Sequence, residues 1–247
     1  MTTLGNLANT GLVNYISFCF LFFVLKFKYY PENGLVWILC FLVASFVIQL
    51  IINIYLTSLP ELCGQADFNI AVYSTVIPWL VIFLLFAVCL SIFPGWLRLF
   101  SNTFGSSAAY LYGLKETMDK IFTVENRSDA ERDQTNFQLL KAIDSLYSDR
   151  DTLIHELDTS DVFFNEKGEI VWKSFTGTLK MLLLTAEIEQ NTLKDLYYSL
   201  LLKDNVAYFV WFLLVGILSV LVSTNTLMNE GCSTKKGGAF DIIFNRT

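Results

Sequence analysis

The chain has 247 residues, of which 54% are hydrophobic and only 16% are charged, and its formal net charge at pH 7 is −6. This composition is too apolar for a soluble domain of that length. The acidic balance also argues against a nucleic-acid-binding protein, because such a protein needs a basic face. Most of the charge lies between Lys115 and Lys203. The composition therefore predicts a membrane protein with one polar insertion.

Residues 1–96 predict an N-terminal membrane region with three spans. A membrane helix needs about 20 apolar residues to cross roughly 30 Å of hydrocarbon. The runs that meet this length are residues 12–30, 35–56 and 70–93. The first run contains Lys26 and Lys28, so its alternative interpretation is a re-entrant or interfacial segment. In the third run, Pro78 predicts a kink.

Residues 97–204 are more polar and show helical periodicity, which predicts a small, mostly helical module. Leu111, Leu114 and Met118 recur at three- and four-residue spacings and predict one apolar helix face. The segment VFFNEKGEIVW, residues 162–172, predicts a short β-hairpin.

The end of this module predicts a helix that leads into the last membrane span. Apolar residues recur at helical spacing from near Thr176 onward. Residues 205–222 then form a charge-free run, which is the fourth predicted span. Residues 223–247 predict a flexible tail.

The distribution of basic residues predicts the orientation, because cytosolic loops are enriched in Lys and Arg. Lys26, Lys28 and Arg98 place the first loop and the polar module on the cytosolic side. Lys235 and Lys236 of the tail fall on the opposite side and break this pattern. The side of the C-terminus therefore stays open.

Two of the five cysteines, Cys63 and Cys232, lie in segments predicted on the non-cytosolic side. In an oxidising compartment they are candidates for a disulfide. The alternative interpretation is a chance placement of two unrelated thiols.

The sequence predicts no enzyme, no cofactor, no metal site and no small-molecule substrate. His155 is the only histidine, and the segment HELD at 155–158 lacks the second histidine of a zinc-protease helix. Acidic residues around it lack the spacing and central glycine of a calcium loop, which favours a solvated acidic face. They are Asp149, Asp151, Glu156, Asp158 and Asp161.

The residues of the predicted spans favour a role in helix packing over a role in transport. Charged groups inside a membrane mark ion or proton paths, and the runs 35–56, 70–93 and 205–222 contain none. Their polar residues include Gln49 and Asn53, which, with Asn14 of the first run, are predicted to form hydrogen bonds between helices. This argues against a proton-coupled carrier, whereas a channel formed by oligomerisation remains an alternative.

The stretch FPGWLRLFSNTFG, residues 93–105, predicts a membrane exit. Pro94 and Gly95 end the span, Trp96 sits in the aromatic belt, and Arg98 reaches lipid phosphate. Apolar residues that follow predict the membrane-facing side of a short interfacial helix. They are Leu97, Phe100 and Phe104. One of Ser101, Asn102 or Thr103 is expected to cap the next helix.

The order of residues in this stretch resembles a segment of membrane proteins from nucleocytoplasmic large DNA viruses, the giant viruses of algae and amoebae. The matching residues are Gly95, Trp96, Phe100, Ser101, Asn102, Thr103, Phe104 and Gly105. The chain departs from that segment at Leu99, where the resemblance leads us to expect proline. The resemblance implies a minor capsid protein without cofactor or catalytic residue, which ties an icosahedral capsid to an internal membrane derived from host endoplasmic reticulum.

The sequence thus predicts a mainly α protein: a transmembrane helical bundle of about four spans with a mostly helical, cytosolic-side insertion. The expected function is a structural virion membrane protein whose partners are the lipid bilayer and other capsid or minor capsid proteins. The alternatives are a scaffold or adaptor of a cellular endomembrane and a subunit of an oligomeric channel.

Overall fold

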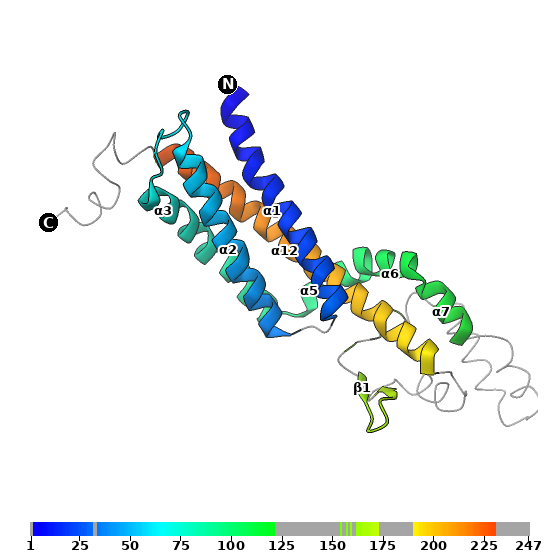
Figure 1. Ribbon diagram of the computed structural model, residues 1–247. Helices are drawn as coiled ribbons and strands as arrows, with labels where there is room; N and C mark the ends of the chain where they lie inside the picture. The colour runs from blue at the N-terminus through cyan, green and yellow to red at the C-terminus, as the bar shows by residue number, and fades with distance from the viewer. Residues whose placement is uncertain are drawn as a thin grey trace, which may run out of the picture. The chain divides into compact units, whose positions relative to one another are not determined.

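The computed structural model describes residues 2–31, 34–121, 154, 157, 159, 162–172 and 190–230, and these residues are mainly helical (Figure 1). Contacts divide the chain into two compact units. The first comprises Met1–Arg98 with Tyr208–Thr247, and the second comprises Leu99–Ala207. The predicted mainly α fold class is confirmed for the described residues.

The first unit is built from long apolar helices. They are α1 (Thr2–Tyr29), α2 (Leu35–Ser58), the consecutive segments α3 (Phe68–Pro78), η1 (Trp79–Leu84) and α4 (Leu85–Ile92), and the C-terminal part of α12 (Gln190–Glu230). Among the described residues, four helical stretches are long and apolar enough to cross a membrane. These are Asn9–Tyr29, Leu35–Ser58, Phe68–Ile92 and Gln190–Asn229. The four predicted spans are therefore confirmed in length and composition.

The distribution of side chains over α2 is reversed relative to a helix of a water-soluble protein. Val36 and Val43 are 68% and 64% exposed, whereas Gln49 and Asn53 are almost completely buried. In water, this arrangement would expose apolar surface and bury polar groups. In a bilayer it is favourable, because lipid solvates the outer face and polar groups must find partners inside the bundle.

The third span changes from α-helix to π-helix directly after Pro78, the residue at which a kink is predicted. Proline has no backbone N–H and its ring crowds the preceding turn, so a regular α-helix cannot pass through it unchanged. The helix continues beyond Pro78 as the π-helical segment η1 before it returns to α-helix at Leu85. Such a wide turn accommodates the missing hydrogen bond without ending the span.

One end of the first unit is fixed by a small apolar cluster and a helix cap. Ile52 and Leu56 of α2 pack with Ile70 of α3 and Leu227 of α12. The carboxylate of Asp67 accepts a hydrogen bond of 3.3 Å from the Ile70 N–H and caps α3. This contact supplies a partner to one of the free N–H groups at the helix start.

The second unit includes short helices that follow the third span. They are η2 (Ser101–Gly105), α6 (Ser106–Tyr112) and α7 (Leu114–Ile121), preceded by α5 (Gly95–Phe100). Gly113 has a φ of +116°, a left-handed conformation that ends α6. Leu114 and Met118 are buried, but Leu111 is 91% exposed. The prediction that all three share one apolar face is wrong, because the break at Gly113 separates Leu111 from the others.

Two short strands of the second unit lie before α12. Among the described residues, β1 (Val162–Phe164) pairs antiparallel with β2 (Ile170–Trp172). The turn between them has Gly168 at a φ of +74°. The side-chain oxygen of Asn165 accepts hydrogen bonds from the N–H groups of Lys167 and Glu169 at 3.0 and 2.8 Å.

The predicted fourth span is part of a longer helix. From Gln190 to Glu230, α12 runs without interruption, so residues 205–222 are only its most apolar portion. Residues up to Ala207 belong to the second unit, and those from Tyr208 onward belong to the first. The predicted helix start near Thr176 and the tail beyond residue 230 lie outside the described residues.

Candidate functional site

The first half of the 93–105 stretch places aromatic side chains against the last span. Helix α5 begins at Gly95, directly after Pro94. The Trp96 ring stacks on Phe93 with centroids 5.7 Å apart and lies 5.9 Å from the Trp211 ring of α12. Trp96 is still 47% exposed. An indole that is half packed and half exposed has the geometry of an aromatic anchor at a membrane surface.

The second half of the stretch forms a π-helix and not a cap. The Ser106 N–H bonds to the Ser101 carbonyl, and the Thr103 hydroxyl donates to the Leu99 carbonyl at 2.8 Å. No side chain caps α6. The expectation that Ser101, Asn102 or Thr103 caps this helix is wrong, because the chain is already helical there and its N–H groups have partners. Hydroxyl groups that bond to their own helix in this way also distort it.

Gly105 lies directly against the backbone of α12. A side-chain carbon at position 105 would overlap the backbone carbonyl oxygen of Lys203. The overlap is with backbone, which cannot rotate away as a side chain does. Glycine is therefore required at this position for space.

Two hydroxyl groups meet the carboxylate of Asp204 beside this contact. Ser101 Oγ donates to Asp204 Oδ1 at 3.3 Å, and Thr159 Oγ1 donates to Asp204 Oδ2 at 2.8 Å. The buried Lys203 ammonium donates to the Ile154 carbonyl at 2.9 Å. Lys203 and Asp204 of α12 thus contact Ser101 of η2 and two residues of the region before β1, Ile154 and Thr159.

The other residues of the stretch lie at the surface or near it. Gly95 and Arg98 are exposed, and no atom lies within 4 Å of a side-chain carbon built on Gly95. Phe100 and Asn102 are half-buried, while Phe104 is 57% exposed. The stretch therefore divides into packing residues, chiefly Ser101 and Gly105, and outward-facing ones.

A hydrogen-bonded polar cluster joins three helices inside the first unit. Asn53 Nδ2 of α2 lies 3.3 and 2.7 Å from the hydroxyls of Ser74 and Thr75 of α3, and 2.9 Å from the Ser223 hydroxyl of α12. Gln49 Nε2 donates to Asn53 Oδ1 at 3.0 Å. The predicted role of Asn53 between helices is confirmed. Asn14, which was expected to do the same, is exposed and takes no part.

Two buried oxygen atoms at this level have no hydrogen-bond partner. They are Gln49 Oε1 and Thr224 Oγ1. Each unpaired buried acceptor costs free energy, of the order of 1–3 kcal/mol. These unpaired atoms reduce the net stabilisation that the cluster provides.

A second buried contact joins the first span to the last. The Tyr15 hydroxyl donates to the Phe212 carbonyl oxygen at 2.7 Å. The Tyr15 ring lies over Gly216, where any side chain would overlap it. Tyr15 is 2% exposed, so the bundle encloses its ring completely.

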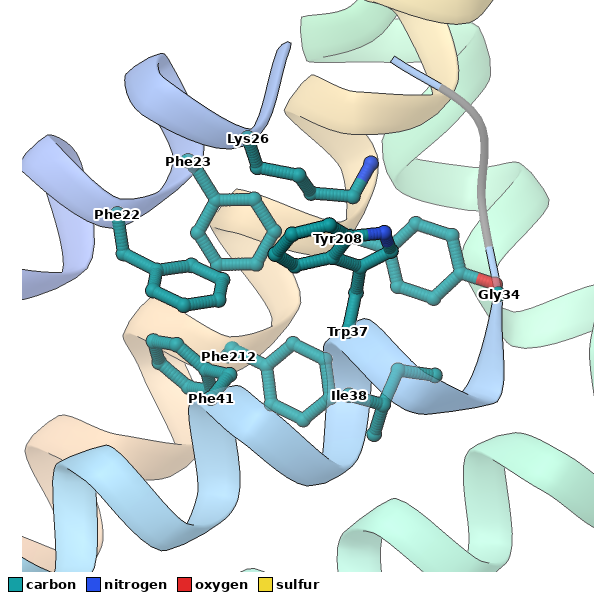
Figure 2. A pocket seen from close by; sticks show the side chains of 9 residues that line it. All are labelled: Phe22, Phe23, Lys26, Gly34, Trp37, Ile38, Phe41, Tyr208 and Phe212. Carbon is teal, nitrogen blue, oxygen red and sulfur yellow. The ribbon is translucent and has the colours of Figure 1, made fainter. Parts of the chain in front are cut away.

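Aromatic rings fill the other end of the bundle and leave a small hollow between α1, α2 and α12. Phe41 lies at the centre, with ring centroids 5.4 Å from Phe23 and 5.2 Å from Phe212. This small hollow is lined by Phe22, Phe23, Lys26, Gly34, Trp37, Ile38, Phe41, Tyr208 and Phe212 (Figure 2).

Of the cysteines in the described part of the chain, one is disulfide-bonded and the others are free thiols. Cys63 is disulfide-bonded, whereas Cys19, Cys40 and Cys89 are free. Cys232 lies outside the described residues. The pairing of Cys63 with Cys232 stays a prediction.

The described residues contain no group of three or more His, Cys, Asp or Glu side chains that is suited to a metal ion. His155 and the acidic residues around it lie outside the described part of the chain. What the described residues offer is a set of helix-to-helix contacts and a small aromatic hollow.

Sequence reasoning missed the residues that decide how the helices fit together. Gly216 and Tyr15 are one such pair, and Ser101 and Asp204 are another. A lone glycine in an otherwise bulky span is a signal for close packing. No pattern in the sequence indicates which residue meets that glycine.

Comparison with protein-family models, curated proteins and solved structures finds no match to this chain. Its class therefore follows from the helices alone. By length, composition and the apolar character of their outer faces, they are those of a multi-span helical membrane protein.

Proposed function

We infer that the chain is a structural membrane protein that attaches a protein layer to a lipid bilayer. The observation that carries this proposal is the contrast between its two units. The first has apolar outer faces and a polar cluster closed on the inside. The second presents charged side chains, including Lys115, Glu116 and Lys194, at its surface. A membrane anchor joined to a polar binding module needs this combination.

The more specific proposal is a minor capsid protein of a virion with an internal membrane. Its support is the resemblance of residues 95–105 to membrane proteins of large DNA viruses. In that setting the membrane derives from host endoplasmic reticulum, and the polar module faces the capsid. Lys26, Lys28 and Arg98 favour the cytosolic side for this module.

Cross-linking mass spectrometry on purified particles tests the proposal. A lysine-reactive cross-linker should join Lys115, Lys120 or Lys194, which are exposed, to capsid or minor capsid proteins. Links only to cellular membrane proteins would instead support the scaffold or adaptor alternative.

The channel alternative has its own measurement. The purified full chain is reconstituted at high density in planar bilayers, and conductance is recorded. We expect no current above that of the empty bilayer. Reproducible single-channel steps would favour an oligomeric channel over a structural anchor.

A further inference from the structure

The outer face of α1 carries two polar side chains within the first span. Asn14 and Ser17 are both exposed, and neither has a hydrogen-bond partner in the described part of the chain. Both belong to the stretch Asn9–Tyr29, which is long and apolar enough to cross a membrane. A polar group without a partner in hydrocarbon costs free energy, because no water is present to bond to it. These side chains therefore need a partner outside the chain.

The depth of these side chains follows from the aromatic residues at the end of α1. Tyr29 and Tyr30 are 62% and 59% exposed, and tyrosines at a span end mark the level of the lipid headgroups. The helical segment from Asn14 to Tyr29 covers about 22 Å. The hydrocarbon layer is roughly 30 Å thick. Asn14 therefore lies inside the hydrocarbon layer, and so does Ser17, which is about one turn nearer to Tyr29.

Asn14 and Ser17 are the first two residues of a seam along α1. Leu21 and Val24 complete it, and they are 56% and 47% exposed. The residues of this seam follow one another at alternating spacings of three and four residues. A repeat of 3.5 residues is the pattern of a helix that pairs lengthwise with another helix.

The seam and the packed face of α1 lie on opposite sides of the helix. Tyr15, Cys19 and Phe23 are buried and attach α1 to the rest of the first unit. With 3.6 residues per turn, these residues point away from the seam. The seam is therefore accessible while the first unit keeps its own packing.

A second copy of the same chain fits this seam. All copies insert with the same topology, so two α1 helices related by a twofold axis along the membrane normal are parallel. Each seam residue then meets its own equivalent at the same depth. A carboxamide has both donors and an acceptor, so two Asn14 side chains can bond to each other. One Asn in such a seam fixes the register and the number of helices.

We propose that α1 is a dimerisation helix, whose seam of Asn14, Ser17, Leu21 and Val24 pairs with the same seam of a second copy. The two Asn14 carboxamides bond to each other inside the bilayer, and the 3.5-residue repeat gives a left-handed crossing. Lys28, the next position at this spacing, is exposed at headgroup level, where the two ammonium groups can extend apart into water. This inference does not depend on the proposed structural function, because any protein with this bundle would have the same seam.

Sedimentation equilibrium of the full chain in a density-matched detergent tests the pairing. We expect a reversible equilibrium between one and two copies as the ratio of protein to detergent rises. Asn14→Leu should raise the dissociation constant of the dimer about tenfold. This factor corresponds to roughly 1.4 kcal/mol and lies in the range for hydrogen bonds between membrane helices. A chain that stays monomeric at every ratio would overturn the proposal.

Two further variants separate the amide bond from general effects. Asn14→Gln keeps a carboxamide and should retain the pairing. Tyr55→Leu removes a polar group from the outer face of α2, where Tyr55 is 56% exposed, and should leave the dissociation constant unchanged. Asn14 has no hydrogen bond within its own chain, so Asn14→Leu leaves the packing of each copy intact. Equal weakening by Asn14→Leu and Tyr55→Leu would show non-specific association and overturn the seam.

Oxidative cross-linking of the full chain in phosphatidylcholine vesicles locates the interface. Ser17→Cys and its control, Val43→Cys, are each made together with Cys40→Ser, because Cys40 is an exposed free thiol. Val43 is 64% exposed on α2. We expect covalent dimers from Ser17→Cys alone. Covalent dimers from Val43→Cys and none from Ser17→Cys would place the interface on α2 and overturn the proposal.

Discussion

The backbone of Gly105 lies against the carbonyl oxygen of Lys203 so closely that no side chain fits between them. Gly105 has ordinary helical angles, with φ at −63° and ψ at −47°, so the position needs glycine for space and not for conformation. Ser101, about one turn earlier in η2, donates to Asp204, the neighbour of Lys203. The order of residues in SNTFG therefore fits a close contact between η2 and α12.

Gly105→Ala should destabilise the second unit. The added methyl group overlaps backbone, and overpacking of this kind costs about 1–3 kcal/mol. The measurement is the thermal unfolding midpoint of the full chain in detergent. Gly95→Ala, ten residues earlier, is the control, because a side-chain carbon at position 95 has no atom within 4 Å. Equal midpoints for the two variants would contradict the close contact.

Tyr15→Phe should weaken the attachment of the first span to the last. The variant keeps the ring over Gly216 but removes the hydroxyl that donates to the Phe212 carbonyl. Hydrogen bonds between membrane helices contribute about 0.6 kcal/mol on average and up to about 1.7.

The free energy of unfolding in mixed micelles measures the loss in Tyr15→Phe. Tyr55→Phe serves for comparison, since Tyr55 is 56% exposed. If Tyr15→Phe and Tyr55→Phe are indistinguishable, the buried bond contributes nothing measurable.

Asn53→Leu should loosen the packing of three helices without unfolding them. The hydroxyls of Ser74 and Thr75 also donate to the Ala71 carbonyl of their own helix, so they keep a partner when the amide is removed. Gln49 Nε2, however, loses its acceptor on Asn53, so the expected loss is about 1–3 kcal/mol.

Asn14→Leu is the matched control for Asn53→Leu, because Asn14 is an exposed residue of the same type. The measurement is hydrogen exchange of the backbone amides in the four spans, compared between the two variants. Faster exchange in Asn53→Leu would report the loosening. Unchanged exchange in Asn53→Leu would mean that the polar cluster does not hold the helices together.

Cys63 should be linked to Cys232. The chain has five cysteines; Cys63 is disulfide-bonded and three others are free, so Cys232 is the remaining candidate. Peptide mapping by mass spectrometry under non-reducing conditions should recover the linked pair. In Cys63→Ser, Cys232 should become reactive to maleimide, and stability should fall by about 2–4 kcal/mol.

Cys89→Ser should change neither the peptide map nor the maleimide reactivity, because Cys89 is free. An alkylated, unlinked Cys232 in the unaltered chain would refute the pairing. A confirmed pair would also place both residues on the non-cytosolic side, since disulfides persist in oxidising compartments.

Much of the fold could be predicted because the membrane imposes a simple rule. A span must be long and apolar, and both properties are read directly from consecutive residues. The buried role of Asn53 followed from the chemistry of a single residue, whereas the π-helical segment after Pro78 was not predicted. The apolar face through Leu111 was not predictable in this way, because the left-handed turn at Gly113 separates residues whose spacing fits one helix.

The candidate sites could not be predicted from the sequence, because they are formed by tertiary contacts. The sequence by itself determined which stretches are long and apolar enough to cross a bilayer, where the chain is polar, and which residues suit a membrane surface, since these depend on local composition. Only the tertiary structure decided that Gly105 meets Lys203, that Gly216 meets Tyr15, and that Lys26 lies among the aromatic rings of α1, α2 and α12. Each of these contacts joins segments distant in sequence, and steric fit between them leaves no periodic signal along the chain.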